Sequence, residues 1–389
     1  MMNKFLKMPK LLAAYILYLF TFDKKDKRII LVSEKKDEAR DNGYYFFKYA
    51  MQRQNENVFY IIEKNSPDLV KLSNYNSKII FYDSFKHYYY YFLSEKMVSS
   101  QSYLYPIGKR ISRTILKNKR KKLYWLQHGV TKDYETKMDY RYSDNVSLVC
   151  CASDKERNFF VENLNYPKQV AQNIGFCRFD GLNDFSDRQK PQILVMPTFR
   201  KWLIPEDYNN PTPKEIQDFK NSDFYSFYND MINSKELIEI LKKNNANIVF
   251  YLHYAFQPYS FLFDSKDSHI IIGKKENDDV QKLMKESSIM VTDFSSVAFD
   301  FAYMEKPVIY AHFDYEKYRE NHYGEGYFSY EKDGFGPVIT TFDDFLNYIQ
   351  QYLRLNCLIE EKYRNRVTEF FDRKDAMNCE RIYNFVINN

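Results

Sequence analysis

The stretch that decides the fold is IMVTDFSSVAFDFAYMEKPVIYAHFD, residues 289–314. Its first residues, Ile289 to Thr292, form a run typical of a buried strand, and an acid and two serines follow: Asp293, Ser295 and Ser296. A strand that gives way to small hydroxyl residues opening a helix leaves free backbone N–H groups at the positive end of the helix dipole. The stretch therefore predicts a strand–helix unit with the geometry of an anion site.

Similar apolar runs recur along the whole chain. They span 28–33, 57–62, 78–83, 96–101, 122–127 and 148–153, and then 192–199, 247–253, 269–274, 288–293 and 307–312. Several are separated by segments of helix length, a pattern typical of parallel sheets with crossover helices. A polar break, NDFSDRQKP at 183–191, divides the two series. The chain is therefore predicted to form two doubly wound α/β domains, 1–185 and 186–389, with the option that the last helix returns to the first domain.

Composition limits the class of protein. The chain has 389 residues, 44% of them hydrophobic, and only ten Gly and twelve Pro, which favours folded domains over fibrous or disordered ones. A net charge of +5 is too small for this length to indicate a nucleic-acid partner. The five cysteines and the few histidines show no disulfide or metal-ligand spacing, so no metal site is predicted.

Two basic clusters stand out. Lys4, Lys7 and Lys10 precede the apolar run 11–22, and Lys24, Lys25, Lys27 and Arg28 follow it. The run is too short to cross a bilayer, and no signal-peptide cleavage site follows. It fits a helix lying in the headgroup region of an anionic membrane, and equally a first helix packed on its own domain. The second cluster, 109–122, fits either a solvated face or a surface for phosphate or lipid headgroups.

The residues at predicted strand ends carry the chemistry. His128 and Gly129 end one strand, and a glycine there allows a tight turn beside the imidazole. A histidine in this position suits a general base, and it equally fits a hydrogen-bonded turn residue. In the second half, strand ends offer Thr198 and Arg200, His253, and the Ser295–Ser296 helix start. Their convergence predicts a pocket for a diphosphate.

The absence of several well-known motifs disfavours some classes of reaction. The sequence has no GxxxxGK[ST] loop, no GxGxxG fingerprint and no nucleophile elbow. The common nucleotide hydrolases and dehydrogenases are therefore disfavoured. A diphosphate pocket in the second domain and a candidate base in the first indicate group transfer from a nucleotide-diphosphate donor.

Several ordered motifs resemble the CDP-glycerol glycerophosphotransferase family, which includes teichoic acid primases and polymerases. The motifs are LQHGV (126–130), GFCRFDGL (175–182), MPTFR (196–200), LH (252–253), TDFSSVAFDFAYMEKPVIYAHFDYEKY (292–318) and GYFSYEKDGFGPVI (326–339). The resemblance covers most of the chain from about residue 30. Two departures are Tyr254, where many members have proline, and the Gln127–His128 pair, where the polymerases have a Trp–His pair.

The resemblance implies a GT-B-like fold, with two doubly wound, Rossmann-like domains facing across a cleft. It implies that the first domain binds the acceptor and the second the CDP-alcohol donor. His128 and His253 are the candidate catalytic residues, with His128 as the base. The candidate substrate-binding residues are Gly129, Thr198, Arg200, Asp293, Ser295 and Ser296. Asp293 is expected to face the ligand and Asp300 to be structural, whereas Arg178 and Asp180 fit either role.

The implied reaction moves glycerol phosphate, or a related polyol phosphate, to a hydroxyl of a lipid-linked glycan or polyol-phosphate acceptor, and CMP leaves. No cofactor is implied beyond the CDP-alcohol donor. The implied location is the cytoplasmic face of the cell membrane, in a teichoic acid or capsule pathway, on an anionic surface. Two alternatives remain open at this point: a GT-B glycosyltransferase that uses a nucleotide sugar, and a membrane-surface binding module without activity.

Overall fold

The computed structural model describes residues 7–21, 29–101, 121–142, 145–207 and 210–389. The chain divides into two compact units. Unit 1 comprises Met1–Val130, Thr136–Gly181 and Arg373–Asn389, and unit 2 comprises Thr131–Glu135 and Leu182–Asp372. This division differs from a single boundary at 185/186 in three respects. The main boundary lies between Gly181 and Leu182, the five residues that follow Val130 belong to unit 2, and the last segment of the chain belongs to unit 1, which is the option named for the last helix.

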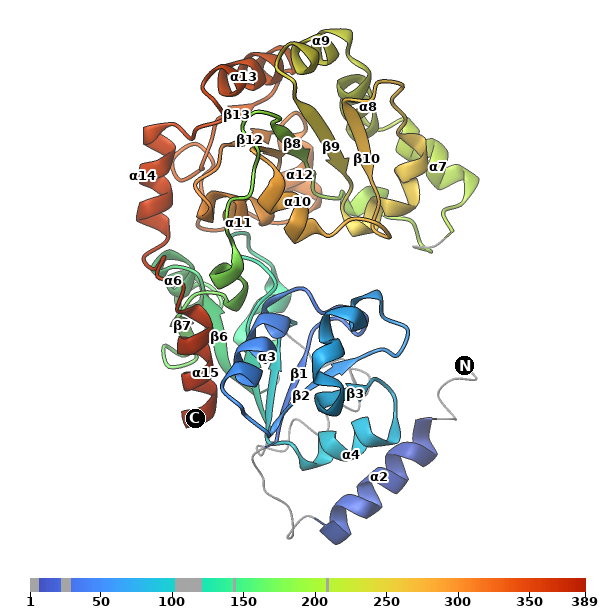
Figure 1. Ribbon diagram of the computed structural model, residues 1–389, viewed down its shortest axis with the longest axis vertical. Coiled ribbons are helices and arrows are strands. Elements are labelled where there is room, and N and C mark those ends of the chain that lie inside the picture. Colours follow the sequence, from blue (N-terminus) through green and yellow to red (C-terminus); the bar gives the residue numbers. More distant parts are fainter. Residues whose placement is uncertain (1–6, 22–28, 102–120, 143–144, 208–209) are drawn as a thin grey trace. The chain divides into compact units, whose positions relative to one another are not determined.

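Unit 1 is built on a parallel sheet of seven strands in the order β3-β2-β1-β4-β5-β6-β7 (Figure 1). The strands are β1 (Ile30–Ser33), β2 (Val58–Ile62), β3 (Ile79–Phe81), β4 (Lys96–Ser99), β5 (Lys122–Trp125), β6 (Val146–Cys151) and β7 (Ala171–Asn173). The order reverses between β1 and β4. In doubly wound sheets, ligands bind where the order reverses, at the carboxyl ends of the strands.

The helices of unit 1 connect these strands. The α-helices are α2 (Lys7–Thr21), α3 (Asn42–Gln52), α4 (Phe85–Leu93), α6 (Asp154–Glu162) and α15 (Asn378–Asn388), and the 3₁₀ segments are η2 (Pro67–Lys78), η3 (Thr136–Met138), η4 (Tyr140–Tyr142) and η5 (Cys177–Gly181). Asp180 accepts hydrogen bonds from the backbone N–H groups of Asn378 and Cys379, at 3.0 and 2.7 Å, and so caps the start of α15. Arg178 pairs with Asp41 at 2.8 Å. Both residues have structural partners within unit 1.

Unit 2 repeats the architecture with a parallel sheet of six strands in the order β10-β9-β8-β11-β12-β13. The strands are β8 (Gln192–Val195), β9 (Asn247–Tyr251), β10 (Ile270–Gly273), β11 (Ile289–Thr292), β12 (Val308–Ala311) and β13 (Val338–Ile339). Its helices are α7 (Pro213–Lys220), α8 (Asp223–Asn233), α9 (Lys235–Lys243), α10 (Val280–Glu286), α11 (Val297–Tyr303), α12 (Tyr315–Asn321), α13 (Phe342–Arg354) and α14 (Glu361–Phe370), with 3₁₀ segments η6 (Lys201–Leu203) and η7 (Tyr254–Leu262). Here the strand order reverses between β8 and β11.

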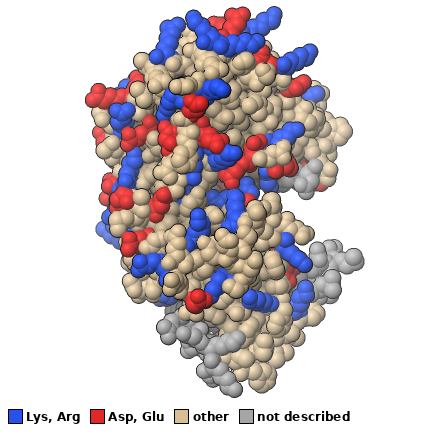
Figure 2. All heavy atoms as spheres, viewed as in Figure 1, with Lys and Arg blue, Asp and Glu red and all other residues tan. Residues whose placement is uncertain are grey.

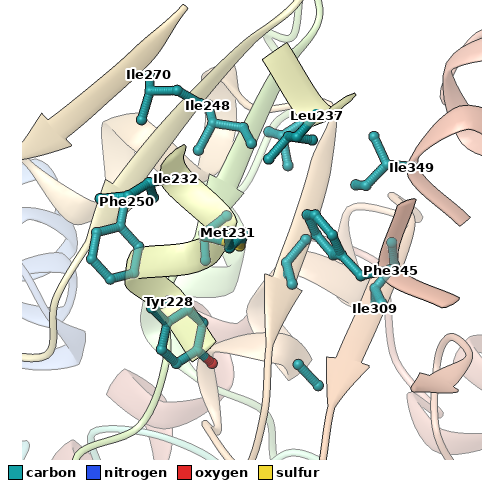
Figure 3. Packing of buried hydrophobic residues seen from close by; sticks show 14 of the residues in the cluster. Tyr228, Met231, Ile232, Leu237, Ile248, Phe250, Ile270, Ile309, Phe345 and Ile349 are labelled. Atoms are coloured by element: carbon teal, nitrogen blue, oxygen red, sulfur yellow. The ribbon is translucent and has the colours of Figure 1, made fainter. Parts of the chain in front are cut away.

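The core of unit 2 packs helix side chains against the sheet. Figure 3 shows Tyr228, Met231 and Ile232 of α8 beside Phe250 of β9, and all four are buried. The apolar spacing along α8 places these three side chains on one face of the helix. Burial of such a cluster fixes the sheet, and with it the strand ends that carry the predicted site residues.

Lys306 and Pro307 lie between the end of α11 and the start of β12, and each has a structural role there. The Lys306 side chain is buried, and its ammonium group donates to the backbone carbonyls of Met284 at 2.6 Å and Ser287 at 2.8 Å. These carbonyls lie at the end of α10, where helix carbonyls lack intrahelical partners. Lys306 therefore holds the end of α10, and Pro307 can begin the extended segment of β12 because it needs no donor there.

Helix α2 is partly packed and partly exposed. It lies beside α4 (Figure 1). Ala14 is buried, and the Tyr15 ring meets Phe92 of α4 edge-on, with ring centroids 5.2 Å apart. Leu12 and Phe20 are 60% and 77% exposed. Of the basic residues predicted to flank this helix, Lys4, Lys24, Lys25, Lys27 and Arg28 lie outside the described residues, as does cluster 109–122 except for its last two lysines. Among the described residues, no helix is both long and apolar enough to cross a bilayer.

Charged side chains are interspersed on the face of the molecule drawn in Figure 2, where Lys and Arg alternate with Asp and Glu. This agrees with the small net charge of +5.

All eleven predicted strands are present, and β7 and β13 are additional. β7 reads Ala-Gln-Asn and β13 has two residues, so neither forms an apolar run. The prediction of two doubly wound α/β domains is confirmed.

Candidate active site

The predicted anion-binding residues of unit 2 lie at the reversal of its strand order. Thr198 and Arg200 follow β8, and Asp293 follows β11, its neighbour in the sheet. The two strand ends are joined directly, because the backbone N–H of Thr198 donates to Asp293 Oδ1 at 2.8 Å. Thr292 Oγ1 also donates to the Met196 carbonyl at 2.7 Å. The structure thus brings these residues together at the place where doubly wound sheets bind ligands.

Arg200 is fully buried and paired with protein carboxylates. Its guanidinium group bonds both oxygens of Asp314, at 2.7 and 2.8 Å, and lies 2.8 Å from Asp293. Burial alone lowers the pKa of the guanidinium group, but the charges of Asp293 and Asp314 outweigh it and raise the pKa. Asp293 is equally buried. Both residues therefore tie the strand ends together in this structure, and a direct contact with a donor stays a prediction.

Ser295 and Ser296 are half-buried at the start of α11. Ser296 occupies the N-cap position but its side chain makes no capping hydrogen bond. Ser295 Oγ accepts weakly from the Val297 N–H at 3.4 Å. Helix α11 has only seven residues, so its dipole is small. This end of the helix can instead offer an anion the two serine hydroxyl groups and the free backbone N–H groups.

His253 is held in one tautomer by its own loop. Its Nδ1 accepts a hydrogen bond from the Ala255 N–H at 3.2 Å, so the neutral ring carries its proton on Nε2. The ring stacks on Phe199 at a centroid distance of 4.6 Å. An Nε2–H held in this way suits donation to a phosphate oxygen, and the role of His253 stays a prediction.

Unit 2 contains a cluster of buried polar atoms without hydrogen-bond partners in the described part of the chain. The atoms are Thr198 Oγ1, both ring nitrogens of His322, Arg319 Nε, Tyr318 OH and Tyr330 OH. Tyr318 stacks on His322 at 4.5 Å, the Arg319 guanidinium lies 5.9 Å from the Tyr318 ring centre, and Phe199, the neighbour of Thr198 in the chain, lies 4.7 Å from His322. Burial lowers the pKa of His322 to about 3, with help from the charges of Lys201 and Arg200. Unpartnered buried polar atoms are costly, so these atoms are candidates for contact with a polar ligand.

The segment Thr131–Glu135 adds charge to the same unit. Asp133 pairs with Arg319 at 2.7 Å and also contacts the ammonium group of Lys132, which lies 5.2 Å from the Tyr330 ring centre. Burial raises the pKa of Asp133, but the charges of Lys132 and Arg319 outweigh it, and the net shift is downward. Two cations thus surround one carboxylate. Sequence reasoning missed Lys132, Asp133, Arg319 and His322, because all four lie just outside the recognised motifs, after LQHGV (126–130) or between the motifs 292–318 and 326–339.

His128 lies in unit 1, in the turn after β5, and its side chain is exposed. Although solvent reaches the ring, the protein packed around it desolvates the imidazole and lowers its pKa below 6.5; Asp41 opposes this shift, and Arg178 and Lys35 add to it. The Ser100 backbone, like Asp41, acts to raise the pKa of the ring. A neutral imidazole can accept a proton at neutral pH, so the geometry is compatible with the predicted base.

The turn beside His128 differs from expectation in one respect. Gly129 was expected to provide the backbone conformation of the tight turn. Gly129 does not have a positive φ, since Gly175 is the one described glycine that does. The left-handed residue is instead Gln127, with φ of 58°. Gly129 itself is buried. The turn is thus made by the residue before the imidazole and not by the one after it.

A family model described as CDP-Glycerol:Poly(glycerophosphate) glycerophosphotransferase matches residues 13–388. The chain belongs to this family. The match includes His128 and all of the strand-end residues of unit 2, so the resemblance inferred from the motifs is confirmed.

Curated members of the glycerophosphotransferase family are similar over part of their length. The minor teichoic acid biosynthesis protein GgaB of Bacillus subtilis is 35% identical over 383 residues, which is 97% of this chain and 41% of GgaB. The teichoic acid poly(ribitol-phosphate) polymerase of Bacillus spizizenii is 26% identical over 51% of this chain and 28% of its own length. The chain therefore spans less than half the length of the curated relatives it matches.

Solved structures share the fold. A variant of the wall teichoic acid polymerase TagF, soaked with CDPG, has a TM-score of 0.68 at 16% identity, covering 100% of this chain and 98% of that one. A complex of Staphylococcus aureus MnaA with UDP has a TM-score of 0.56 at 12% identity, covering 93% and 96%. These likenesses support the GT-B-like class with two Rossmann-like domains.

Within the described ranges, no group of three or more His, Cys, Asp or Glu side chains is arranged to hold a metal ion. The predicted absence of a metal and of a cofactor stays a prediction.

Proposed function

We propose that this chain transfers glycerol phosphate, or a related polyol phosphate, from a CDP-alcohol to a hydroxyl group of a polyol-phosphate or lipid-linked glycan acceptor. The observation that carries the proposal is the family match over residues 13–388, which spans both units. GgaB, at 35% identity, is a minor teichoic acid biosynthesis protein, and the proposed pathway is accordingly teichoic acid synthesis.

The donor is proposed to bind unit 2 where the strand order reverses. The unpartnered atoms of Thr198 and His322 and the hydroxyl groups of Ser295 and Ser296 supply polar contacts. His253, with its proton on Nε2, supplies a further donor to a phosphate oxygen. Arg200 and Asp293 are proposed to act indirectly. They are buried and paired with each other, so they fix the strand ends that carry the donor-binding residues. Such fixed donors stabilise charge as it develops on the leaving phosphate.

His128 is proposed to be the general base. Its neutral ring takes the proton of the acceptor hydroxyl, and the alcohol oxygen forms a bond to the phosphorus that carries glycerol. The bond from that phosphorus to the bridging oxygen breaks, and CMP leaves with the electron pair.

The exposed apolar residues of α2 support a peripheral association with an anionic membrane surface. Leu12, Ile16, Leu19 and Phe20 are exposed, and exposed Lys10 lies on the same helix. Apolar side chains beside basic ones are typical of helices that lie at the headgroup boundary. The proposed location is the cytoplasmic face of the cell membrane, where a lipid-linked acceptor is present.

The choice of donor tests the proposal. The protein is incubated with a short polyol-phosphate acceptor and either CDP-glycerol, CDP-ribitol or UDP-sugars, and released CMP and UDP are quantified. Release of CMP with growth of the acceptor by one polyol-phosphate mass is expected. Release of UDP with sugar transfer, and no CMP, would instead establish a nucleotide-sugar glycosyltransferase.

A further inference from the structure

The backbone just before His128 adopts a strained conformation. Gln127 has φ of 58°, a region that favours glycine over residues with a side chain. Ten described non-glycine residues have positive φ, but only Gln127 and Cys357 among them are buried. A strained, buried and polar residue persists only where its surroundings over-determine it, and such positions concentrate at functional sites.

The side chain of Gln127 is clamped on one side of the turn. Its Nε2 donates to the Cys150 carbonyl at 2.6 Å and to Glu156 Oε1 at 3.0 Å. Glu156 is fully buried on α6, and its other oxygen accepts from the Ala152 N–H at 2.6 Å. A glycine at position 127 would relieve the backbone strain but could not make these bonds. The amide of Gln127 therefore supplies contacts that glycine, the residue favoured by this backbone conformation, could not make.

The backbone of the same turn is held from the other side by Asn42. Its Nδ2 donates to the carbonyls of Leu126 at 3.2 Å and Gln127 at 2.8 Å. Its Oδ1 accepts from the Arg178 N–H at 3.0 Å, and Asn42 is fully buried at the start of α3. Asn42 and Glu156 thus hold the residue preceding His128 between two helices of unit 1.

We infer that Gln127, Glu156 and Asn42 are positioning residues that fix the His128 imidazole in the orientation required of a general base. The inference rests on the proposed function, because it assumes that His128 acts as the base. The network holds the peptide that precedes the ring, and with it the direction in which the His128 side chain leaves the backbone.

The test compares Gln127→Gly, Glu156→Gln and their double variant with wild-type protein, using CDP-glycerol and a polyol-phosphate acceptor. Gln127→Gly keeps the left-handed backbone without strain and is expected to fold. Its kcat should fall by about 10- to 100-fold, because a small misplacement of a catalytic group has effects of this order. The KM for CDP-glycerol should stay within about twofold. Glu156→Gln should lower kcat by a smaller factor. The double variant should lower kcat no further than Gln127→Gly alone, because the two side chains act as one unit.

A second readout reports on the ring directly. The His128 imidazole is titrated by NMR, with its signal assigned by its disappearance in His128→Asn. In Gln127→Gly the titration should move toward the ordinary pKa of 6.5, because a loosened turn lets water solvate the ring. A residue with a purely structural role would leave this titration unchanged.

Asn165→Gly is the matched control, because it too replaces a left-handed residue with glycine and removes an amide hydrogen bond. Asn165 also has φ of 58°, and its amide donates to Asp139 at 2.6 Å, but it lies elsewhere in unit 1. It should leave kcat and the His128 titration unchanged. If His128→Asn abolishes turnover while Gln127→Gly keeps kcat within about twofold of wild type, the positioning role is wrong and the proposed function stands. If His128→Asn keeps its turnover, the proposed base is wrong and the positioning role falls with it.

Discussion

Arg200 and Asp314 form a two-point ion pair in the interior of unit 2, with Nε–Oδ2 and Nη2–Oδ1 distances of 2.7 and 2.8 Å. Asp293 lies 2.8 Å from the same guanidinium group. The planar guanidinium therefore connects the segments that follow β8, β11 and β12, which carry the proposed donor-binding residues.

Replacement of Arg200 by glutamine should destabilise unit 2 strongly. The change leaves Asp293 and Asp314 as uncompensated buried charges, and loss of one partner from such a pair costs about 3–5 kcal/mol. Urea unfolding followed by tryptophan fluorescence measures the effect. Arg364→Gln is the control, because Arg364 and its partner Glu305 are both exposed and 3.7 Å apart. Equal shifts of the urea midpoint in the two variants would show that the buried network contributes little.

Thr198→Val should weaken donor binding without weakening the fold. Thr198 Oγ1 is buried and has no described partner, so replacing the hydroxyl with a methyl group removes no protein hydrogen bond. The Kd for CDP-glycerol, measured by calorimetry, should rise about tenfold, as expected for a lost hydrogen bond to a charged ligand. Ser288→Ala is the control, since Ser288 Oγ is also buried and unpartnered but precedes β11 and so lies at the opposite end of that strand. Unchanged affinity in Thr198→Val would remove Thr198 from the donor site.

Phe20→Asp should reduce binding to vesicles that contain phosphatidylglycerol. Phe20 is 77% exposed on α2, and transfer of such a side chain into an apolar environment contributes about 1.5–3 kcal/mol, or at least about tenfold in binding. Co-sedimentation measures the bound fraction. Phe261→Asp, at a 64% exposed position in unit 2, is the control. If both variants bind as wild type does, α2 is a packing element and not a membrane contact.

The acid limb of the pH–rate profile should report the His128 imidazole. A general base must be unprotonated, so kcat/KM should fall as the pH drops through the pKa of the free ring. Because desolvation lowers that pKa, the half-maximal rate is expected below pH 6.5. A profile whose acid limb has its midpoint above pH 6.5 would be incompatible with this environment.

Much of the fold is predictable because buried parallel strands read as apolar runs, as Ile289–Thr292 does. β7 and β13 were missed because they are short, and β7 is also polar. The strand-end positions of Thr198 and His253 were predictable for the same reason, since parallel strands present their carboxyl ends at one edge. The pairing of Arg200 with Asp314 was not predictable, because the partner lies 114 residues away and the motif that contains Asp314 does not indicate which residue it contacts.

The turn at His128 shows a different limit. A glycine beside a candidate base suggested where the backbone would turn, yet the positive φ belongs to Gln127. What stabilises that choice is the contact of the Gln127 amide with Glu156, 29 residues later on α6. Only the folded sheet brings β5 and α6 to the same edge. The local sequence indicates which residues favour a positive φ, whereas the tertiary contact determines which residue adopts it.

The most direct test of the central claim is the rate of CMP release from CDP-glycerol in wild-type protein and in His128→Asn, with donor affinity measured in parallel. Acceptor-dependent CMP release is predicted in wild type, with a loss of at least about 100-fold in the variant, because general base catalysis contributes on this order. Donor affinity should be unchanged, because the proposed donor contacts belong to unit 2. A variant that releases CMP at the wild-type rate would contradict the account.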